Sequence, residues 1–176
     1  MDDEKYMALA ILEARKAFDK GQFPVGCVIV EGNQVIAAGS RAGTAGDQPF
    51  FSEISHAEIL ALRSLETLEA GYDQKKTTLY CTMEPCLMCY GAIILAGIKR
   101  IVYAYEDAMG GGTACDFSRM PPLYKNCEIE VVPGVLRQKS LDLFYKFFNK
   151  EANLYWKDSY LETYTRQQHE LAGQEK

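Results

Sequence analysis

Apolar residues recur at helical spacing near the start of the chain, behind the acidic residues Asp2 and Asp3. They are Tyr6, Met7, Ala10, Ile11, Ala14, Ala17 and Phe18. Spacings of three and four place them on one face, so the pattern predicts a helix that Asp2 or Asp3 can cap. Two short apolar runs at residues 25–30 and 34–38 then flank Glu31-Gly32-Asn33, a composition typical of a tight hairpin turn.

The middle of the chain alternates between strand and helix patterns. A loop at residues 40–55 precedes a helix that begins at His56 and ends before Gly71. A strand at 78–82, a helix at 85–96 closed by Gly97, and a strand at 100–105 follow. Such units pair their strands in parallel and place helices on the faces of the sheet.

A fifth strand is predicted at 128–132 and an amphipathic helix at 137–150, whose apolar side carries Leu141, Phe144, Tyr145 and Phe148. The predicted fold is therefore α/β, a three-layer α/β/α sandwich around a mixed five-stranded sheet. We expect residues 1–150 to form one domain and residues 151–176 to form a C-terminal helical extension with a polar tail.

Two segments could shape a pocket. The glycine-rich run 109–113 predicts a turn, with a mobile lid as the alternative. In the extension, Tyr155, Trp156, Leu161 and Tyr164 recur at near-helical spacing; we expect core packing, with stacking on a substrate ring as the alternative. Beyond Thr165 the chain is polar, and we expect it to be frayed, with His169 in solvent.

Composition narrows the class of partner. The chain has 176 residues, of which 48% are hydrophobic, enough for one core without disulfide staples. Its 19 Lys and Arg against 24 Asp and Glu give a net charge of −5, which disfavours nucleic acid without excluding it. No apolar run is long enough for a membrane span and no signal peptide is evident, so we expect a cytoplasmic protein.

Six cysteines are present. Cys27 and Cys81 fall in strand patterns, where free cysteine usually behaves as a small buried hydrophobe, and Cys115 and Cys127 receive no role. Cys86 and Cys89 differ, because their spacing puts both sulfurs on one face at the start of a helix, where the partial positive charge favours thiolates.

His56, Cys86 and Cys89 together supply three zinc ligands and leave one tetrahedral position open for water. Zinc lowers the pKa of such a water to about 7 in well-tuned sites, and Glu58 is the natural carboxylate to accept its proton. Residues two apart on an ideal helix point about 200° apart, so both His56 and Glu58 reach one site only if His56 opens the helix. Alone, the cysteine pair could instead be a redox motif or half of a structural zinc knuckle.

His56-Ala57-Glu58 with Pro85-Cys86-Leu87-Met88-Cys89 matches the zinc-deaminase pattern. With Phe23-Pro24-Val25-Gly26 and Asp107-Ala108, the chain resembles the cytidine and deoxycytidylate deaminase superfamily from about residue 23 to 148, most closely the branch of tRNA adenosine deaminases and guanine deaminases. The resemblance implies a cytidine deaminase-like fold and hydrolysis of an exocyclic amine to a carbonyl with release of ammonia.

The sequence departs from the tRNA-acting members at the base-recognition positions. Where those carry an Asn after the second strand, this chain reads Gly39-Ser40-Arg41. Ser40, Arg41 and Glu53 are therefore candidates for substrate contact, with solvated loop residues as the alternative. The motif positions Phe23, Val25, Ala57, Glu84, Pro85 and Asp107 are further candidates implied by the resemblance.

Three functions follow in order of preference. The first is a zinc-dependent deaminase of a nucleobase, nucleoside or nucleotide, the second a tRNA-specific adenosine deaminase, and the third a non-catalytic zinc-stabilised binding module. Residues 89–96 form a helix that is apolar nearly all round, and relatives are commonly oligomers, so we also predict a homodimer.

Overall fold

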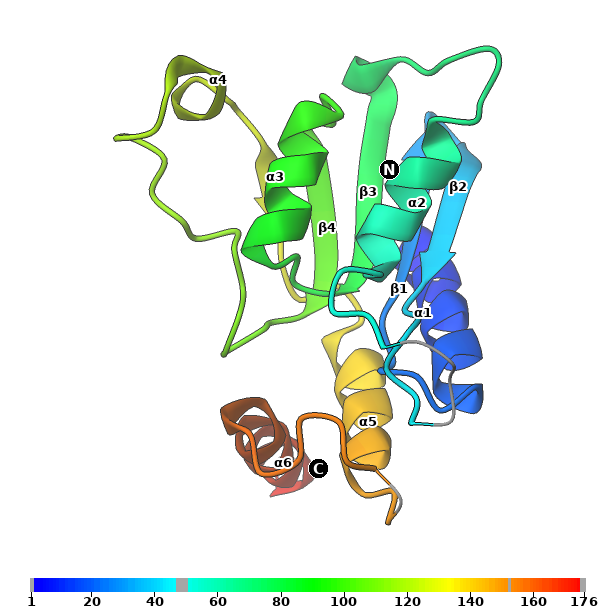
Figure 1. Cartoon of the computed structure of the whole chain (residues 1–176), viewed down its shortest axis with the longest axis vertical. Coiled ribbons are helices and arrows are strands. Elements are labelled where there is room, and N and C mark those ends of the chain that lie inside the picture. The colour runs from blue at the N-terminus through cyan, green and yellow to red at the C-terminus, as the bar shows by residue number, and fades with distance from the viewer. Residues whose placement is uncertain (1, 47–50, 152, 175–176) are drawn as a thin grey trace.

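The computed structural model describes residues 2–46, 51–151 and 153–174. Its five-stranded sheet has the order β2-β1-β3-β4-β5 (Figure 1). The strands are β1 (Gly26–Glu31), β2 (Gln34–Ser40), β3 (Thr77–Met83), β4 (Arg100–Tyr105) and β5 (Glu130–Val132). β1 is antiparallel to β2 and β3, whereas β3, β4 and β5 are parallel, which confirms the predicted mixed sheet.

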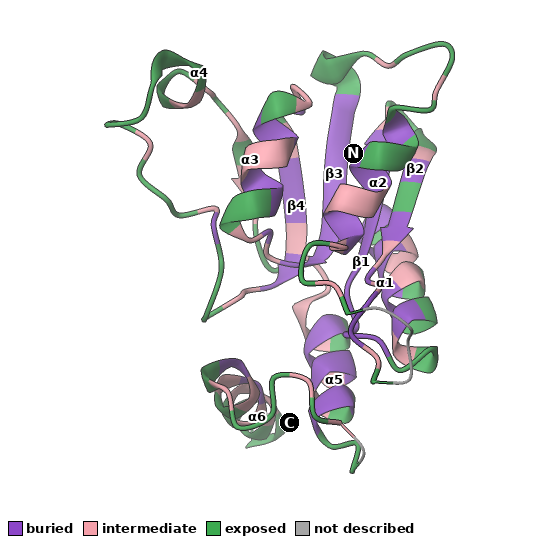
Figure 2. Ribbon diagram, in the orientation of Figure 1, coloured by how far each residue is buried: buried purple, intermediate pink, exposed green. Residues whose placement is uncertain are grey.

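Helices cover both faces of this sheet. Val28, Tyr80 and Val102 point to α1 (Asp3–Asp19), whereas the alternate positions Cys27, Cys81 and Ile101 pack against α2 (Ala57–Leu65) and α3 (Leu87–Leu95). The central strand β3 is buried along its whole length (Figure 2). The three-layer prediction is confirmed, and Cys27 and Cys81 are buried partners in adjacent strands, as expected for small hydrophobes.

Several helix boundaries differ from the predictions. The helix expected to run to residue 70 ends at Leu65, where the Thr67 hydroxyl donates to the Ser64 carbonyl and competes with helical bonding. The short helices η1 (Gln74–Lys76) and α4 (Pro122–Lys125) have too few residues for a periodic pattern to predict. In the expected loop 40–55, residues 47–50 lie outside the described residues.

The C-terminal helices α5 (Arg137–Phe148) and α6 (Tyr160–Gln174) lie side by side beyond the end of the sheet (Figure 1). Phe144, Phe147 and Phe148 of α5 pack around Phe23. The sequence placed Phe144 and Phe148 on the apolar side of this helix but did not name Phe147. Tyr145 was assigned to that side wrongly, because it is only half-buried.

The expectation of a frayed tail beyond Thr165 is wrong for residues 165–174, which continue α6. Thr165 is fully buried, and Arg166 donates to the Phe148 carbonyl, so contacts with α5 hold the helix in place. His169 is not simply solvated: its ring stacks on Tyr145 at 3.7 Å between centroids. None of the helices in the described part of the chain has the length and apolar character needed to cross a membrane.

Candidate zinc site and substrate cavity

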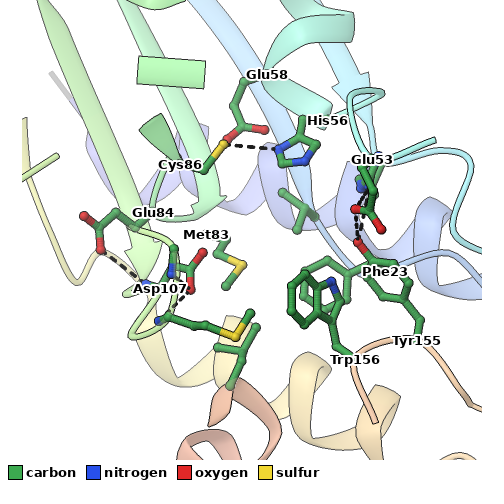
Figure 3. Close-up of a pocket in the computed structure, with 15 residues that line it drawn as sticks. Phe23, Glu53, His56, Glu58, Met83, Glu84, Cys86, Asp107, Tyr155 and Trp156 are labelled. Carbon is green, nitrogen blue, oxygen red and sulfur yellow. Dashed lines mark hydrogen bonds and ion pairs between the residues drawn. The ribbon is translucent and has the colours of Figure 1, made fainter. Parts of the chain in front are cut away.

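His56 opens α2 as its N-cap residue. Its backbone is extended, with φ −68° and ψ 151°, whereas Glu58 already lies in the first helical turn. This change of backbone geometry brings both side chains to the same side, although they are two residues apart in sequence (Figure 3). The prediction that His56 begins the helix is confirmed.

Cys86 occupies the equivalent N-cap position of α3, with φ −68° and ψ 170°. Its Sγ lies 3.6 Å from His56 Nδ1, and Cys89 Sγ lies 3.4 Å from the same nitrogen. The three atoms all lie within 4.8 Å of one another, close enough to share one metal ion. The two helix starts meet because α2 and α3 pack side by side on one face of the sheet.

The electrostatics of the cluster favour a bound cation. Hydrogen bonds from Cys89 and then His56 lower the pKa of Cys86 to about 4, which favours a thiolate. Glu58 is 3% exposed, and burial raises the pKa of its carboxyl. Its Oε2 has no hydrogen-bond partner among the described residues. One imidazole, two thiols and an orphaned carboxylate oxygen form a donor set that fits zinc with an open fourth position.

A cavity of about 250 Å³ opens beside this cluster (Figure 3). Its lining comes from the ends of β3 and β4, the starts of α2 and α3, and the C-terminal extension. The lining residues are Phe23, Val25, Arg41, Glu53, His56, Glu58, Met83, Glu84, Cys86, Asp107, Met109, Gly110, Tyr155, Trp156 and Leu161.

Six of the nine candidates for substrate contact line this cavity: Phe23, Val25, Arg41, Glu53, Glu84 and Asp107. Ser40, Ala57 and Pro85 are absent from its lining. The Ser40 hydroxyl donates to Glu13 at 2.7 Å, on the side of α1, and Ala57 is fully buried in the core. The Pro85 carbonyl accepts from Gly112. The geometry of the cavity therefore gives no support to these three, and their contact with substrate stays a prediction.

Glu84 and Asp107 hold the glycine-rich segment 109–113 in a turn. Glu84 accepts hydrogen bonds from the Asp107 and Thr113 backbones at 3.2 Å, and Asp107 Oδ1 accepts from the backbones of Met109 and Gly110. A Cβ atom on Gly112 would lie 2.6 Å from the Leu87 backbone, so only glycine allows this approach. The predicted turn, rather than a lid, is what this geometry describes.

Met109 and Gly110 belong to the glycine-rich run that was expected to shape a pocket, whereas Met83 received no role from the sequence. For Tyr155, Trp156 and Leu161 the sequence favoured core packing. Leu161 is buried, as expected, but Tyr155 and Trp156 form a wall of the cavity. Trp156 has a left-handed backbone, with φ 54°, and is 41% exposed. The aromatic composition of residues 155–164 is the signal in the sequence, and it agrees with the alternative of a substrate-facing ring.

The sequence of residues 1–105 matches the family described as the cytidine and deoxycytidylate deaminase zinc-binding region. The chain belongs to this family. A tRNA-specific adenosine deaminase of Haemophilus influenzae is 36% identical over 149 residues, covering 84% of each chain. One from Bacillus subtilis is 32% identical over 148 residues, covering 84% of this chain and 89% of that protein.

Solved structures give the same assignment. A structure from work on A-to-I editing by tRNA deaminases at the wobble position superposes with a TM-score of 0.65 at 31% identity, covering 79% of this chain and 98% of that one. A variant of the protein NE0047 in complex with 8-azaguanine gives 0.63 at 25% identity, covering 82% and 84%. The protein is a zinc-dependent hydrolytic deaminase, and Zn²⁺ is its cofactor.

Proposed function

We propose that His56, Cys86 and Cys89 hold the zinc ion, and that Glu58 moves protons during deamination of a nucleobase, nucleoside or nucleotide. The observation that carries this assignment is the buried Glu58 Oε2, which lacks a partner among the described residues and lies beside the three-ligand cluster. A buried, unpaired acid is costly to a fold, so its position favours a chemical role.

Zinc, when bound, supplies the Lewis acidity that lowers the pKa of water to about 7. Glu58 Oε2 accepts a proton as water adds to the ring carbon that bears the amine. Glu58 passes this proton to the adjacent ring nitrogen, then accepts the second proton from the new hydroxyl group and gives it to the departing amine, so the carbon–nitrogen bond breaks, ammonia leaves and a carbonyl forms. Burial suits Glu58 to both steps, since its raised pKa lets the carboxyl hold a proton between them.

The dimensions of the cavity support a small substrate. At about 250 Å³ it lies just below the range of about 300–1,000 Å³ usual for drug-sized ligands, which suits one base. Phe23 and Trp156 offer aromatic faces along its wall. Together with a net charge of −5, these features favour a free compound over a polyanion.

A tRNA-specific adenosine deaminase is the second candidate, favoured by relatives with that activity at 32–36% identity. Ammonia release from guanine, adenine, cytosine and their nucleosides, compared with release from a tRNA anticodon stem-loop, separates the two. We expect turnover of at least one free compound. Activity restricted to the stem-loop would establish the second candidate instead.

Glu58→Gln tests the catalytic assignment against a zinc-stabilised binding module. We expect wild-type zinc content and thermal stability with kcat reduced by roughly 10²–10⁴-fold, the range for loss of a general acid–base group. Glu66→Gln, on the exposed end of the same helix, is the matched control and should retain full activity. Equal turnover by both variants would remove Glu58 from the mechanism.

We further propose a homodimer built on α3. Figure 2 shows that parts of α3 are exposed. Its apolar residues Leu87, Met88 and Leu95 are 58%, 39% and 64% exposed. A second copy would cover them. Light scattering should give twice the chain mass, and Leu95→Glu should halve it; a monomeric wild type would refute the proposal.

We propose the boundary near residue 150 as the division between the deaminase domain and an extension that covers the substrate cavity through Tyr155 and Trp156. We also propose a cytoplasmic location, because two thiolate ligands stay available to zinc only in a reducing compartment.

A further inference from the structure

A second polar cluster lines the cavity apart from the zinc site, formed by Arg41, Glu53 and Tyr155 (Figure 3). The Tyr155 hydroxyl donates to Glu53 Oε2 at 2.8 Å. Arg41 Nη2 lies 3.4 Å from the same oxygen. The three residues come from the end of β2, the loop before α2 and the C-terminal extension, so the folded chain assembles the cluster.

Arg41 is held by the protein rather than offered to a ligand. Its side chain is 2% exposed, and its guanidinium donates to the carbonyls of Ala42 and Ser52, each at 2.9 Å. These bonds fix the position of the positive charge behind Glu53. Arg41 therefore orients the carboxylate and is poorly placed to bind an anionic group of a substrate.

Glu53 has the opposite character. Its side chain is 51% exposed, and its contacts with Arg41 and Tyr155 both fall on Oε2. Within the described part of the chain, Oε1 has no hydrogen-bond partner. A carboxylate accepts hydrogen bonds and cannot donate them, so this oxygen can bind an N–H or O–H donor of a ligand that replaces solvent.

The rest of the cavity also offers mainly acceptors. Four carboxylates line it among the described residues, those of Glu53, Glu58, Glu84 and Asp107. Both oxygens of Glu84 and Oδ1 of Asp107 already accept hydrogen bonds from the segment 107–113, and Glu58 belongs to the zinc site, which leaves Glu53 Oε1 and Asp107 Oδ2 for a ligand. Glu53 and Asp107 lie on opposite sides of the cavity (Figure 3). A bound ring therefore encounters acceptors from two directions, which favours a substrate with several N–H donors.

We propose that Glu53 is a specificity-determining residue that selects guanine-type rings, with Tyr155 and Arg41 as its positioning residues. Guanine carries a donor, N1–H, next to the amine-bearing carbon, and another N–H on its five-membered ring. In adenine and cytosine, the ring nitrogens beside the reacting carbon are acceptors, which a carboxylate repels. This inference rests on the proposed function, since it names the substrate class of the same site.

The test measures kcat and KM for guanine, adenine and cytosine with zinc-loaded wild type and variants. Glu53→Gln should lower kcat/KM for guanine about 10–100-fold, chiefly through KM, because a half-exposed charged hydrogen bond is lost. The same variant should leave adenine turnover unchanged or improved, since the new amide can donate. Glu69→Gln, at an exposed glutamate outside the cavity lining, is the charge-matched control and should equal wild type.

Tyr155→Phe removes one bond that positions Glu53 while leaving the carboxylate in place. We expect KM for guanine to rise about 3–10-fold with kcat and the guanine preference retained. This variant also keeps the test decisive if Glu53→Gln fails to fold, which zinc content and thermal unfolding would reveal.

The outcomes distinguish failure of the proposed small-molecule function from failure of the proposed role of Glu53. If wild type deaminates no free base, nucleoside or nucleotide, the proposed small-molecule function fails. If wild type prefers adenine or cytosine, or if Glu53→Gln changes KM equally for all three bases, the function stands and the role of Glu53 is refuted.

Discussion

Asp3 provides a test of how the first helix is fastened to the sheet. Its two carboxylate oxygens each accept a hydrogen bond from the Arg100 guanidinium at 2.9 Å, and Oδ1 also accepts from the Tyr80 hydroxyl at 2.9 Å. One side chain thus links α1 to β3 and β4. Asp3 and Arg100 are 22% and 21% exposed, so solvent screens the ion pair only partly.

Asp3→Asn removes the charge and one acceptor oxygen. An exposed ion pair contributes about 0.2–1 kcal/mol, and breaking a buried one costs about 3–5 kcal/mol. A bidentate pair at intermediate burial should fall between, so we expect the free energy of unfolding to drop by about 1–2 kcal/mol, or roughly 0.5–1 M in the urea midpoint. Asp2→Asn is the matched control: it makes the same charge change, and asparagine still caps Lys5 as Asp2 does.

The effect has a defined pH dependence. Hydrogen bonding by Arg100 lowers the pKa of Asp3 below its usual value near 3.8. The stabilisation is therefore fully present above the unfolded pKa and is lost as the pH falls through the lower folded pKa. Wild type and Asp3→Asn should differ from about pH 7 down to about pH 4 and converge below it. A gap that persists at about pH 2, or an equal loss in Asp2→Asn, would refute the reasoning.

Three further outcomes are expected. Gly26→Ala should lower the free energy of unfolding by about 1–3 kcal/mol in thermal melts, because a Cβ there would lie 2.2 Å from the Ala14 backbone nitrogen of α1. The control Gly46→Ala, where a Cβ would have no described atom within 4 Å, should change this free energy by less than about 0.5 kcal/mol. A chelator should abolish ammonia release, and added zinc should restore it; activity that survives full removal of zinc would contradict the proposed chemistry. Metal analysis should show that Cys89→Ser loses zinc and that Cys115→Ser, at an exposed cysteine outside the ligand cluster, retains it.

The layers of the fold could be predicted because each element buries one side. Alternating residues of β1 and β3 point to opposite helical layers, and the spacing of α1 carries the same information over four turns. The end of helix α6 could not be predicted from such patterns. Residues beyond Thr165 are polar, and what holds them helical is contact with distant residues, such as Arg166 with the Phe148 carbonyl.

The metal cluster could likewise be read from short spacings, since a helix start fixes where His56 and Glu58, or Cys86 and Cys89, point. The recognition side of the cavity has no such local rule. Glu53 and Tyr155 are 102 residues apart, and their hydrogen bond depends on how the extension crosses the cavity.

The difference between the predictable metal cluster and the unpredictable recognition side of the cavity has a chemical basis. Hydrolysis of any amino-substituted ring needs the same metal and the same acid, so those residues must keep a fixed spacing whatever the substrate. Discrimination between rings needs only one acceptor or donor at the right distance, and any segment that reaches the cavity can supply it. In this chain Arg41 is held by backbone carbonyls, and Glu53, which that arginine contacts from behind, faces the cavity. A change of substrate therefore requires only that a neighbouring loop and the C-terminal extension place a different polar atom beside an unchanged reaction centre.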